Sequence, residues 1–290
     1  MVSVPLTLIL MAAGMGSRFG GPKQLTPVGP NGESILDYNA HDAAAADFDR
    51  VVVITRAELL DQVTERVDRG VGKVVPTEIV LQQVPEGRSK PLGTAEAVSL
   101  AAPFVDGPFG VANSDDLYGA AAFRLLGDHL RDITHRDDPD APGAVVAYRL
   151  ADTVPEGTGP VTRGVLSSRD GEHLDVIVEV HGVERAGDGW RPQEVEGIGR
   201  ITGGEPVSAN LWGLPAWAMD PMQEAVDDFV ESGAEGEVYL PEVVGALVAS
   251  GRLTVKLLPT PEPWCGMTNL EDLPLVREQA AARWRSPLWS

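Results

Sequence analysis

The feature that most constrains this chain is an apolar run near its N-terminus that breaks directly into a glycine-rich loop. Residues 6–11 (LTLILM) have the length and composition of a buried parallel strand, and residues 14–23 (GMGSRFGGPK) follow it. Glycines let backbone N–H groups come close to a ligand, and two cations in the loop, Arg18 and Lys23, suit phosphate. The strand and its loop therefore predict a cradle for a triphosphate.

Two better-known glycine loops do not fit these residues. The dinucleotide fingerprint G-x-G-x-x-G needs glycine at the position of Phe19, and Thr55 stands where a ribose-binding acid is expected. The P-loop G-x-x-x-x-G-K-[ST] needs lysine directly after its second glycine, but Pro22 follows Gly21. The displaced lysine is followed by Gln24, which has no hydroxyl group for magnesium. Both motifs are therefore excluded.

Alternating strands and helices predict an α/β fold. The predicted strands are 50–55, 78–83, 109–112, 144–149, 208–214 and 253–258, and the predicted helices are 34–46, 57–69, 94–102, 119–134, 217–232, 239–250 and 269–284. Ser34 and Thr94 are expected to cap their helices. The segment 182–204, rich in glycine and charge, is expected to be an exposed excursion. The β-loop-α-β-α-β opening predicts a doubly wound sheet with helices on both faces.

Two adjacent carboxylates, Asp115 and Asp116, come immediately after the predicted strand 109–112. Such a pair is costly to bury unless it caps a helix, binds a cation or stays in water. Magnesium explains the pair best, because a hard divalent ion takes one or two carboxylates together with phosphate oxygens. The alternative is that Asp116 lies near the start of the following helix as a cap.

The pattern G-x-G-x-R-x-G-G-x-K-Q-L after a first strand resembles the signature of the sugar-phosphate nucleotidyltransferases, which include glucose-1-phosphate thymidylyltransferase and UTP–glucose-1-phosphate uridylyltransferase. The resemblance is dense over residues 8–119 and thinner afterwards. It implies a Rossmann-like nucleotide-diphospho-sugar transferase fold of GT-A type, with a mixed, mostly parallel sheet flanked by helices. We expect a single domain over residues 1–290, with the nucleotide-binding part at about 1–135 and the acceptor-binding part at about 136–290.

The resemblance also assigns roles on the nucleotide side. Arg18 and Lys23 bind the phosphates and are expected to be catalytic. A glutamine near a P-L-G-x-x-x-A-V turn reads the nucleobase, and an amide suits this work because it offers a donor and an acceptor. Adjacent strand residues face opposite ways, so we favour Gln82 and keep Gln83 as the alternative. The expected nucleotide-binding residues are Ala13, Gly14, Gly16, Ser17, Gln82, Gln83, Pro91, Gly93 and Thr94.

On the acceptor side, the resemblance implies that Asp115 is the metal ligand, with Mg²⁺ as the cofactor. The expected acceptor-binding residues are Asp116, Arg163, Gly164, Glu179 and Asn210. A salt bridge at a strand edge is the alternative for Glu179.

Two departures from the family pattern stand out. The E-K-P triplet of relatives is Glu179-Val180-His181 here, which leaves Arg163 or His181 to meet the sugar phosphate. Gly266 replaces the second metal-binding aspartate of W-x-D-x-G-T, so Asp116 or Asp272 is a candidate substitute.

The implied reaction joins a nucleoside triphosphate and a sugar 1-phosphate to give a nucleoside diphosphate sugar and pyrophosphate, by magnesium-dependent in-line attack on the α-phosphate. Three alternatives stay open: a GT-A glycosyltransferase, transfer onto a cyclitol or alcohol phosphate, and a non-catalytic nucleotide-binding sensor. The resemblance leaves the nucleobase and the acceptor open.

Charge and composition limit the partners of the chain. The formal net charge of −20 argues against nucleic-acid and anionic-membrane binding. No run of about 18 apolar residues occurs, and the first residues lead into a site motif, so we expect neither a membrane span nor a signal peptide. Cys265 is the single cysteine, so we expect no internal disulfide and a cytoplasmic location. A homo-oligomer is an open expectation, because relatives often assemble.

Overall fold

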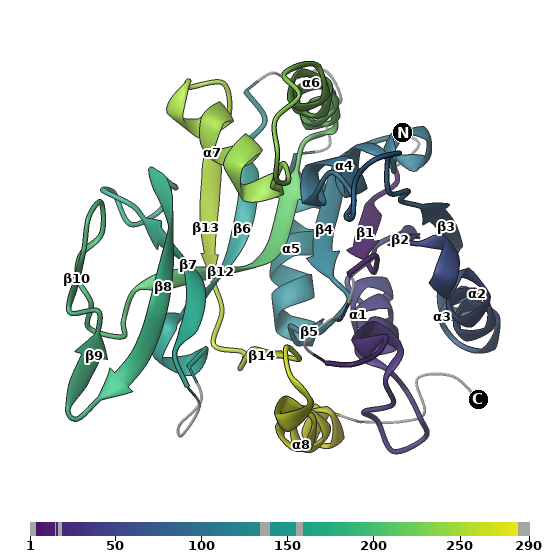
Figure 1. The fold of residues 1–290 in the computed structure, drawn as a ribbon, viewed down its shortest axis with the longest axis horizontal. Coiled ribbons are helices and arrows are strands. Elements are labelled where there is room, and N and C mark those ends of the chain that lie inside the picture. Colours follow the sequence, from purple (N-terminus) through teal and green to yellow (C-terminus); the bar gives the residue numbers. More distant parts are fainter. Residues whose placement is uncertain (1–3, 15, 17–18, 134–139, 155–158, 284–290) are drawn as a thin grey trace.

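The computed structural model describes residues 4–14, 16, 19–133, 140–154 and 159–283, and its centre is a ten-stranded sheet (Figure 1). The strand order is β3-β2-β1-β4-β12-β7-β8-β9, with β6 beside β12 and β13 beside β6. The strands are β1 (Thr7–Met11), β2 (Arg50–Thr55), β3 (Thr77–Leu81), β4 (Phe109–Asn113), β6 (Gly143–Arg149), β7 (Val161–Ser167), β8 (Val176–Ala186), β9 (Gly189–Arg191), β12 (Pro206–Leu214) and β13 (Val255–Pro259).

The sheet is mixed. Strands β3, β2, β1 and β4 are parallel neighbours, as are β13 and β6, whereas β12 runs antiparallel to β4, β6 and β7. The register of β12 against β6 shifts between Ser208 and Trp212, which marks a bulge. The predicted α/β fold, with a mixed sheet flanked by helices, is confirmed, and the predicted strand 50–55 is matched residue for residue by β2.

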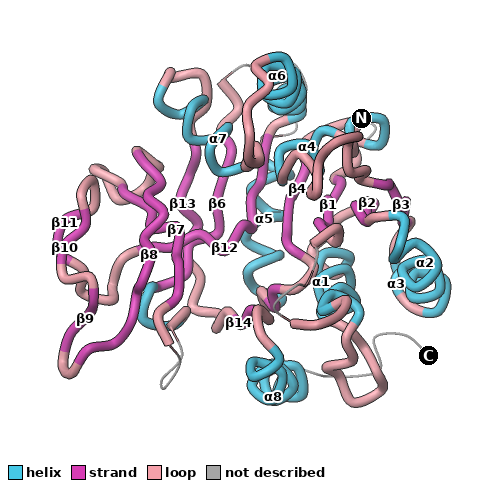
Figure 2. The backbone as a smooth tube through the Cα atoms, in the orientation of Figure 1, coloured by secondary structure: helices cyan, strands magenta, loops and turns pink. Residues whose placement is uncertain are grey.

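Helices cover both faces of the sheet (Figure 2). They are α1 (Ile35–Ala44), α2 (Leu60–Arg69), α3 (Val71–Val74), α4 (Thr94–Ser99), α5 (Ala120–Asp132), α6 (Met219–Glu231), α7 (Leu240–Ala249) and α8 (Leu273–Arg283). Side chains alternate along β1, so Leu8 and Leu10 join the core under α1, α2 and α5, while Ile9 and Met11 join the core under α4, α6 and α7. No helix in the described ranges has the length and apolarity needed to cross a membrane.

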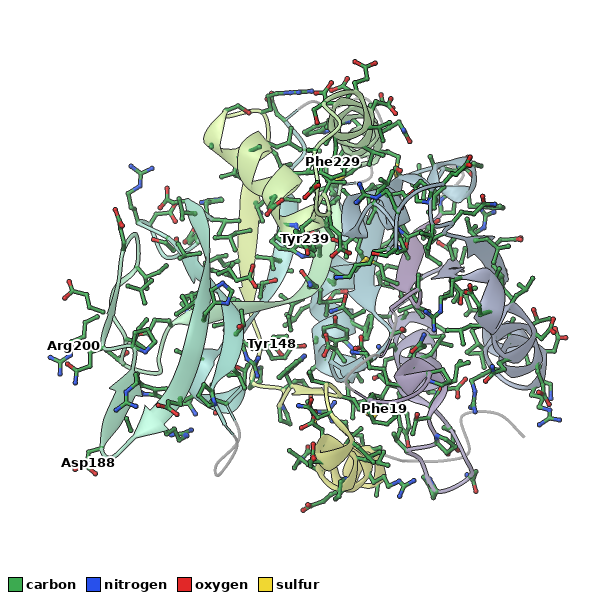
Figure 3. The ribbon with its side chains drawn as sticks, in the orientation of Figure 1. Phe19, Tyr148, Asp188, Arg200, Phe229 and Tyr239 are labelled. Carbon is green, nitrogen blue, oxygen red and sulfur yellow. The ribbon has the colours of Figure 1, made fainter. Side chains whose placement is uncertain are left out.

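The segment predicted as an exposed excursion is mostly exposed, and it also forms strands that extend the sheet. Strand β8 continues to Ala186 and forms a hairpin with β9, and the short strands β10 (Glu194–Val195) and β11 (Gly199–Arg200) pair with each other. Trp190 is buried against this arm, with Ile201 in the same core cluster. Figure 3 shows Asp188 and Arg200 at its outer edge, far from Tyr239. The exposure of this segment was predicted, but its strands were not, because two buried apolar side chains anchor a segment that is otherwise polar.

Helix α1 is tied to α2 by a buried ion pair. Ser34 precedes α1 in a capping box, as predicted, and the side chain of Asp37 is fully buried. Asp37 Oδ2 accepts hydrogen bonds from Ser34 N at 2.7 Å and from Arg66 Nη1 at 2.6 Å. Burial raises the pKa of Asp37, and the charge of Arg66 opposes that rise. The pair therefore holds α1 in place, and α1 carries a residue of the site described below.

We expect Arg66→Met to lower the free energy of unfolding by about 3 kcal/mol, because it leaves the buried Asp37 carboxylate without its cation. Arg69→Met is the matched control: Arg69 lies on the same helix but pairs with Glu65 at the surface, so its loss should cost about 0.5 kcal/mol or less. Urea denaturation of both variants measures the difference. Equal losses would show that Asp37 needs no partner.

Candidate functional site

A cleft of about 770 Å³ opens beyond the carboxyl ends of β1 and β4, the place where open α/β sheets bind ligands. Most of the site residues expected from the sequence line it: Ala13, Gly14, Gly16, Lys23, Gln82, Pro91, Gly93, Thr94, Asp115, Asp116, Arg163, Gly164, Glu179 and Asn210. Gln83 is exposed outside the lining. Ser17 and Arg18 fall outside the described residues, so their roles stay predictions.

The glycine loop closes tightly on itself. Gly16 has φ 60°, and a Cβ there would collide with the carbonyl oxygen of Gly21, so the turn requires glycine. Gln24 is buried behind the loop, and its Nε2 donates to the Ala12 carbonyl oxygen at 2.7 Å. Lys23 reaches out of the loop to form an ion pair with Asp115.

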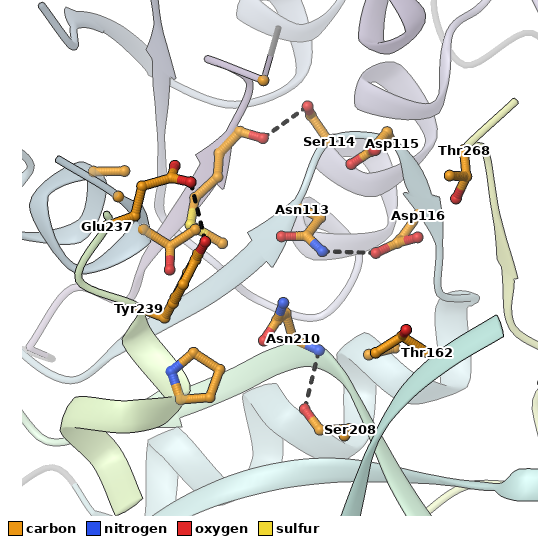
Figure 4. Close-up of a pocket in the computed structure, with 18 of the residues that line it drawn as sticks. Asn113, Ser114, Asp115, Asp116, Thr162, Ser208, Asn210, Glu237, Tyr239 and Thr268 are labelled. Carbon is orange, nitrogen blue, oxygen red and sulfur yellow. Dashed lines mark hydrogen bonds between the residues drawn. The ribbon is translucent and has the colours of Figure 1, made fainter. Parts of the chain in front are cut away.

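The turn that carries the two carboxylates is held from several sides. Asn39 of α1 donates through Nδ2 to the carbonyl oxygens of Asn113 at 3.0 Å and Asp116 at 2.9 Å. Ser114 Oγ donates to the Met11 carbonyl oxygen at 2.8 Å, a bond drawn in Figure 4. The Tyr118 hydroxyl, itself fully buried, accepts from Asn113 N at 3.0 Å. Asn39 and Tyr118 were not expected from the sequence, because they act from α1 and from behind the turn.

Asp116 is a nearly buried carboxyl group. Burial, and next the charge of Asp115, raise the pKa of Asp116 to about 7, while a 2.7 Å hydrogen bond from Asn113 Nδ2 opposes the rise (Figure 4). The capping alternative for Asp116 is wrong: Gly119 precedes α5, and Glu262 Oε1 accepts from Ala121 N at 3.2 Å in the first turn. Asp116 therefore belongs to the cleft and not to the helix.

The position of the missing aspartate lies directly against this carboxyl group. Strand β14 (Cys265–Gly266) pairs antiparallel with β5 (Asp116–Leu117), which places Gly266 opposite Asp116. A Cβ on Gly266 would collide with Asp116 Oδ1 and would lie 2.5 Å from Trp264 Cζ2. Asp116 and Trp264 therefore already fill the space that a side chain at position 266 would need. Asp272, the other candidate substitute, accepts bonds from the N–H groups of residues 268 and 269 and lies outside the cleft lining.

The loop expected to read the base is fixed by backbone contacts with a distant segment. Val238 N donates to the Leu92 carbonyl oxygen at 2.7 Å, and Ala95 N donates to the Val238 carbonyl oxygen at 3.1 Å. Thr94 does not cap α4 as predicted; Gly93 precedes the helix, and Thr94 Oγ1 accepts from Leu240 N at 2.8 Å. The cap prediction failed because the hydroxyl serves a residue 146 positions away.

The opposite wall of the cleft carries an amide side chain, Asn210, and a cation, Arg163. Asn210 sits in the β12 bulge with φ 62°, an uncommon conformation for a non-glycine residue, and its Oδ1 accepts from Trp212 Nε1 at 3.3 Å. Arg163 stacks over Trp264 with 4.7 Å between Cζ and the ring centroid, and its guanidinium donates to the Thr162 carbonyl oxygen at 2.7 Å. Of the two candidates for the missing lysine, Arg163 lines the cleft and His181 does not.

Sequence reasoning missed the acidic rim of the cleft, formed by Glu237, Tyr239 and Glu242 at the start of α7. The Tyr239 hydroxyl donates to Glu237 Oε2 at 3.0 Å (Figure 4). Burial, this hydrogen bond, and the charges of Glu237, Glu242 and Glu179 raise the pKa of Tyr239. Lys90, which also lines the cleft, lies 3.8 Å from Glu237 and is well exposed. No local motif marks these residues; only the folding of α7 onto α4 brings them here.

We expect Gly266→Ala to destabilise the protein by about 1–3 kcal/mol, because the added Cβ overlaps Asp116 and Trp264. Gly245→Ala is the matched control: it lies within α7 with no atom near its Cβ position, and it should stabilise the protein by about 0.5–1 kcal/mol. Thermal unfolding of the two variants gives the comparison. A stable Gly266→Ala protein would mean that β14 is packed less tightly than described.

The pKa of Asp116 predicts a pH-dependent stability. Because the folded pKa of about 7 exceeds the ordinary value of 3.8, the stabilisation from protonated Asp116 is complete below about pH 4 and is lost as the pH rises through 7. The stability advantage of Asp116→Asn over the wild type should therefore grow by about 2–3 kcal/mol between pH 5 and pH 8 without divalent cations. Denaturation at both pH values checks this, with Asp188→Asn at the exposed arm as the control. A constant difference across the pH range would contradict it.

Comparisons with known proteins find related domains. A family model described as the MobA-like NTP transferase domain matches residues 8–107. The bifunctional protein GlmU of Gluconacetobacter diazotrophicus is 26% identical over 264 residues, which cover 89% of this chain and 47% of that protein. GlmU of Rhodococcus opacus is 27% identical over 253 residues, covering 86% and 44%. The chain thus spans a little under half the length of these curated relatives.

Solved structures share the fold over almost the whole chain. The inositol-1-phosphate CTP transferase from T. maritima has a TM-score of 0.64 at 16% identity and covers 96% of this chain and 95% of its own. A putative glucose-1-phosphate thymidylyltransferase from Bacillus anthracis has a TM-score of 0.67 at 14% identity, with 98% of both chains covered. Residues 8–107 thus match a MobA-like NTP transferase domain, and the predicted resemblance of the chain to the sugar-phosphate nucleotidyltransferases, enzymes of the nucleotidyltransferase class, is confirmed.

Proposed function

We propose that the chain transfers a nucleotidyl group from a nucleoside triphosphate to a sugar 1-phosphate, releasing pyrophosphate and forming a nucleoside diphosphate sugar. A role in making nucleotide sugars follows from this reaction. The names of the related proteins support the reaction class, and the layout of the cleft supports it for this chain.

The observation that carries the proposal is that one cleft joins three different kinds of surface. The glycine loop with Lys23 suits phosphates, the turn with Asp115 suits a cation, and the bulge with Asn210 suits hydroxyl groups. A glycosyltransferase needs a cation site and a hydroxyl-binding wall but no loop for a triphosphate. The glycine loop therefore favours nucleotidyl transfer.

In the proposed reaction, an oxygen of the acceptor phosphate attacks the α-phosphorus in line and pyrophosphate leaves. A phosphate monoester is already an anionic nucleophile, so no protein base is required. The task of the chain is to hold two polyanions together and to neutralise them. Lys23 is suited to bind triphosphate oxygens, while Glu179 and Asn210 are placed to bind acceptor hydroxyl groups.

The donor set in the cleft fits a magnesium ion. Asp115 and Asp116 are adjacent carboxylates that line one cleft, and burial beside Asp115 makes the charged form of Asp116 costly without a cation. Magnesium, when bound, would neutralise phosphate charge there. No group of three or more histidine, cysteine, aspartate or glutamate residues suited to a metal occurs in the part of the chain described. Asp115 and Asp116 would therefore hold it together with substrate oxygens, and Lys23 would leave Asp115 for the triphosphate.

The acceptor class has a second candidate, a cyclitol 1-phosphate. Glu179, Asn210, Ser208 and Thr162 line the acceptor wall, and their hydrogen-bonding groups suit the hydroxyl groups of a sugar or of a cyclitol. Val180, which is buried in β8, stands at the position of the lysine in the E-K-P triplet, so the wall lacks that cation. The name of the T. maritima structure adds inositol 1-phosphate to the panel worth testing. A cytoplasmic location and a homo-oligomeric state remain our proposals.

A pyrophosphate-release assay tests the function. The common nucleoside triphosphates are combined with sugar and cyclitol 1-phosphates, with and without magnesium. Lys23→Met should lower turnover roughly ten- to a hundredfold, because it removes one charge-assisted phosphate contact worth about 1.5–3 kcal/mol. Lys73→Met is the control, since Lys73 is exposed and outside the cleft, and it should keep full activity.

Three outcomes would contradict the proposal. Full activity of Lys23→Met would remove the loop from the chemistry, and activity without any divalent cation would remove the metal. Nucleotide binding without pyrophosphate release for any acceptor in the panel would favour the sensor alternative.

A further inference from the structure

The side-chain amide of Gln82 is held in one orientation by the protein. Its Nε2 donates to the Gly93 carbonyl oxygen at 2.9 Å and to Glu96 Oε2 at 2.7 Å. The same Glu96 oxygen accepts from Leu92 N at 3.0 Å, so Glu96 ties Gln82 to the turn before α4. Gln82 is 5% exposed, and what it exposes lines the cleft.

The polarity of this arrangement follows from the partners. A carbonyl oxygen and a carboxylate can only accept hydrogen bonds, so the amide nitrogen, and not the amide oxygen, must face Gly93 and Glu96. Both amide hydrogens are then used. Among the described residues no hydrogen bond to Gln82 Oε1 occurs, which leaves this oxygen as the group that a ligand in the cleft can reach.

We propose that Glu96 is a positioning residue for nucleobase selection, which locks Gln82 so that its Oε1 accepts a hydrogen bond from an N–H group of the base. This inference rests on the proposed function, because it needs a nucleoside triphosphate in the cleft. The ligand class is a nucleobase that presents an amino or imino N–H group at this edge. A base with only acceptors there would leave Oε1 facing a lone pair and would be rejected.

A simpler interpretation is that Glu96, an acidic residue in the first turn of α4, only stabilises the N-terminus of that helix. That reading needs only its negative charge and its bulk. The proposed role needs an acceptor oxygen at the position of Oε2, whether charged or neutral. Two variants separate these roles, because Glu96→Gln keeps an acceptor oxygen without the charge, and Glu96→Leu keeps similar bulk without any acceptor.

The experiment measures the equilibrium binding of ATP, GTP, CTP and UTP by calorimetry, with magnesium and no acceptor, to the wild type and both variants. The discrimination ratio is the affinity of the best triphosphate over that of the next best. We expect Glu96→Leu to reduce this ratio about tenfold and Glu96→Gln to keep it within about twofold. Glu86→Gln, an exposed change outside the cleft, is the control and should match the wild type.

Inorganic tripolyphosphate is the second probe, because it has no base. All variants should bind it as the wild type does, which shows that they are folded and that the phosphate loop is intact. If neither tripolyphosphate nor any nucleotide binds the wild type, the proposed function fails. If nucleotides bind with discrimination and Glu96→Leu keeps that discrimination, only the role of Glu96 fails. Loss of discrimination in Glu96→Gln as well would assign the effect to charge and overturn the positioning role.

Base analogues test the direction of the hydrogen bond. For the best triphosphate, the comparison uses an analogue that lacks an N–H group without added bulk: zebularine for CTP, nebularine for ATP, inosine for GTP and 3-deazauridine for UTP, each as its triphosphate. The analogue should bind the wild type about tenfold more weakly than the parent, and Glu96→Leu with a much smaller difference. Equal binding of analogue and parent to the wild type would overturn the proposal that Oε1 accepts from this group.

Discussion

The structure depends on keeping two adjacent carboxylates at the end of a buried strand. Asp116 has little contact with water and lies beside Asp115, so the turn has a high electrostatic cost in the absence of cations. Lys23 lowers this cost by pairing with Asp115, and Asn113 lowers it by donating to Asp116. The electrostatic cost that is left favours the binding of a divalent cation together with a polyanionic ligand.

The surroundings of this turn are built to the same requirement. Asn39 holds its two carbonyl groups from α1, and α1 is itself fixed by the buried pair of Asp37 and Arg66. Gly266 leaves room for the Asp116 carboxyl group where any side chain would collide with it. In the sequence, Gly266 marks the loss of a metal ligand. In the structure, the absence of a side chain at Gly266 allows the Asp116 carboxyl group to lie where it does.

The two sides of the cleft are joined by hydrogen bonds rather than by proximity alone. Val238 bridges Leu92 and Ala95, and Thr94 holds the first turn of α7 through Leu240. The loop proposed to read the base and the acidic rim with Glu237 are therefore connected by direct hydrogen bonds.

Much of this protein can be predicted from local sequence. Strand β2 and the glycine loop follow from short-range patterns, because a buried strand needs a run of apolar residues and a loop that approaches phosphate needs glycine. The two adjacent carboxylates can also be recognised from the sequence, because such a pair after a buried strand is costly unless it binds a cation, caps a helix or stays in water. The start of the α/β pattern and the loop and turn that line one part of the cleft therefore need little more than residues 6–119.

Only the tertiary structure decided which atoms are free to bind. Whether Gln82 offers a donor or an acceptor depends on Glu96 and Gly93, and whether position 266 can hold an aspartate depends on a strand pairing with Asp116. The role of Thr94 and the acidic rim at Tyr239 depend on helices 146 positions apart meeting. Sequence patterns report the periodicity of one segment, whereas hydrogen-bond partners and steric exclusion are set by segments that meet only in the folded chain.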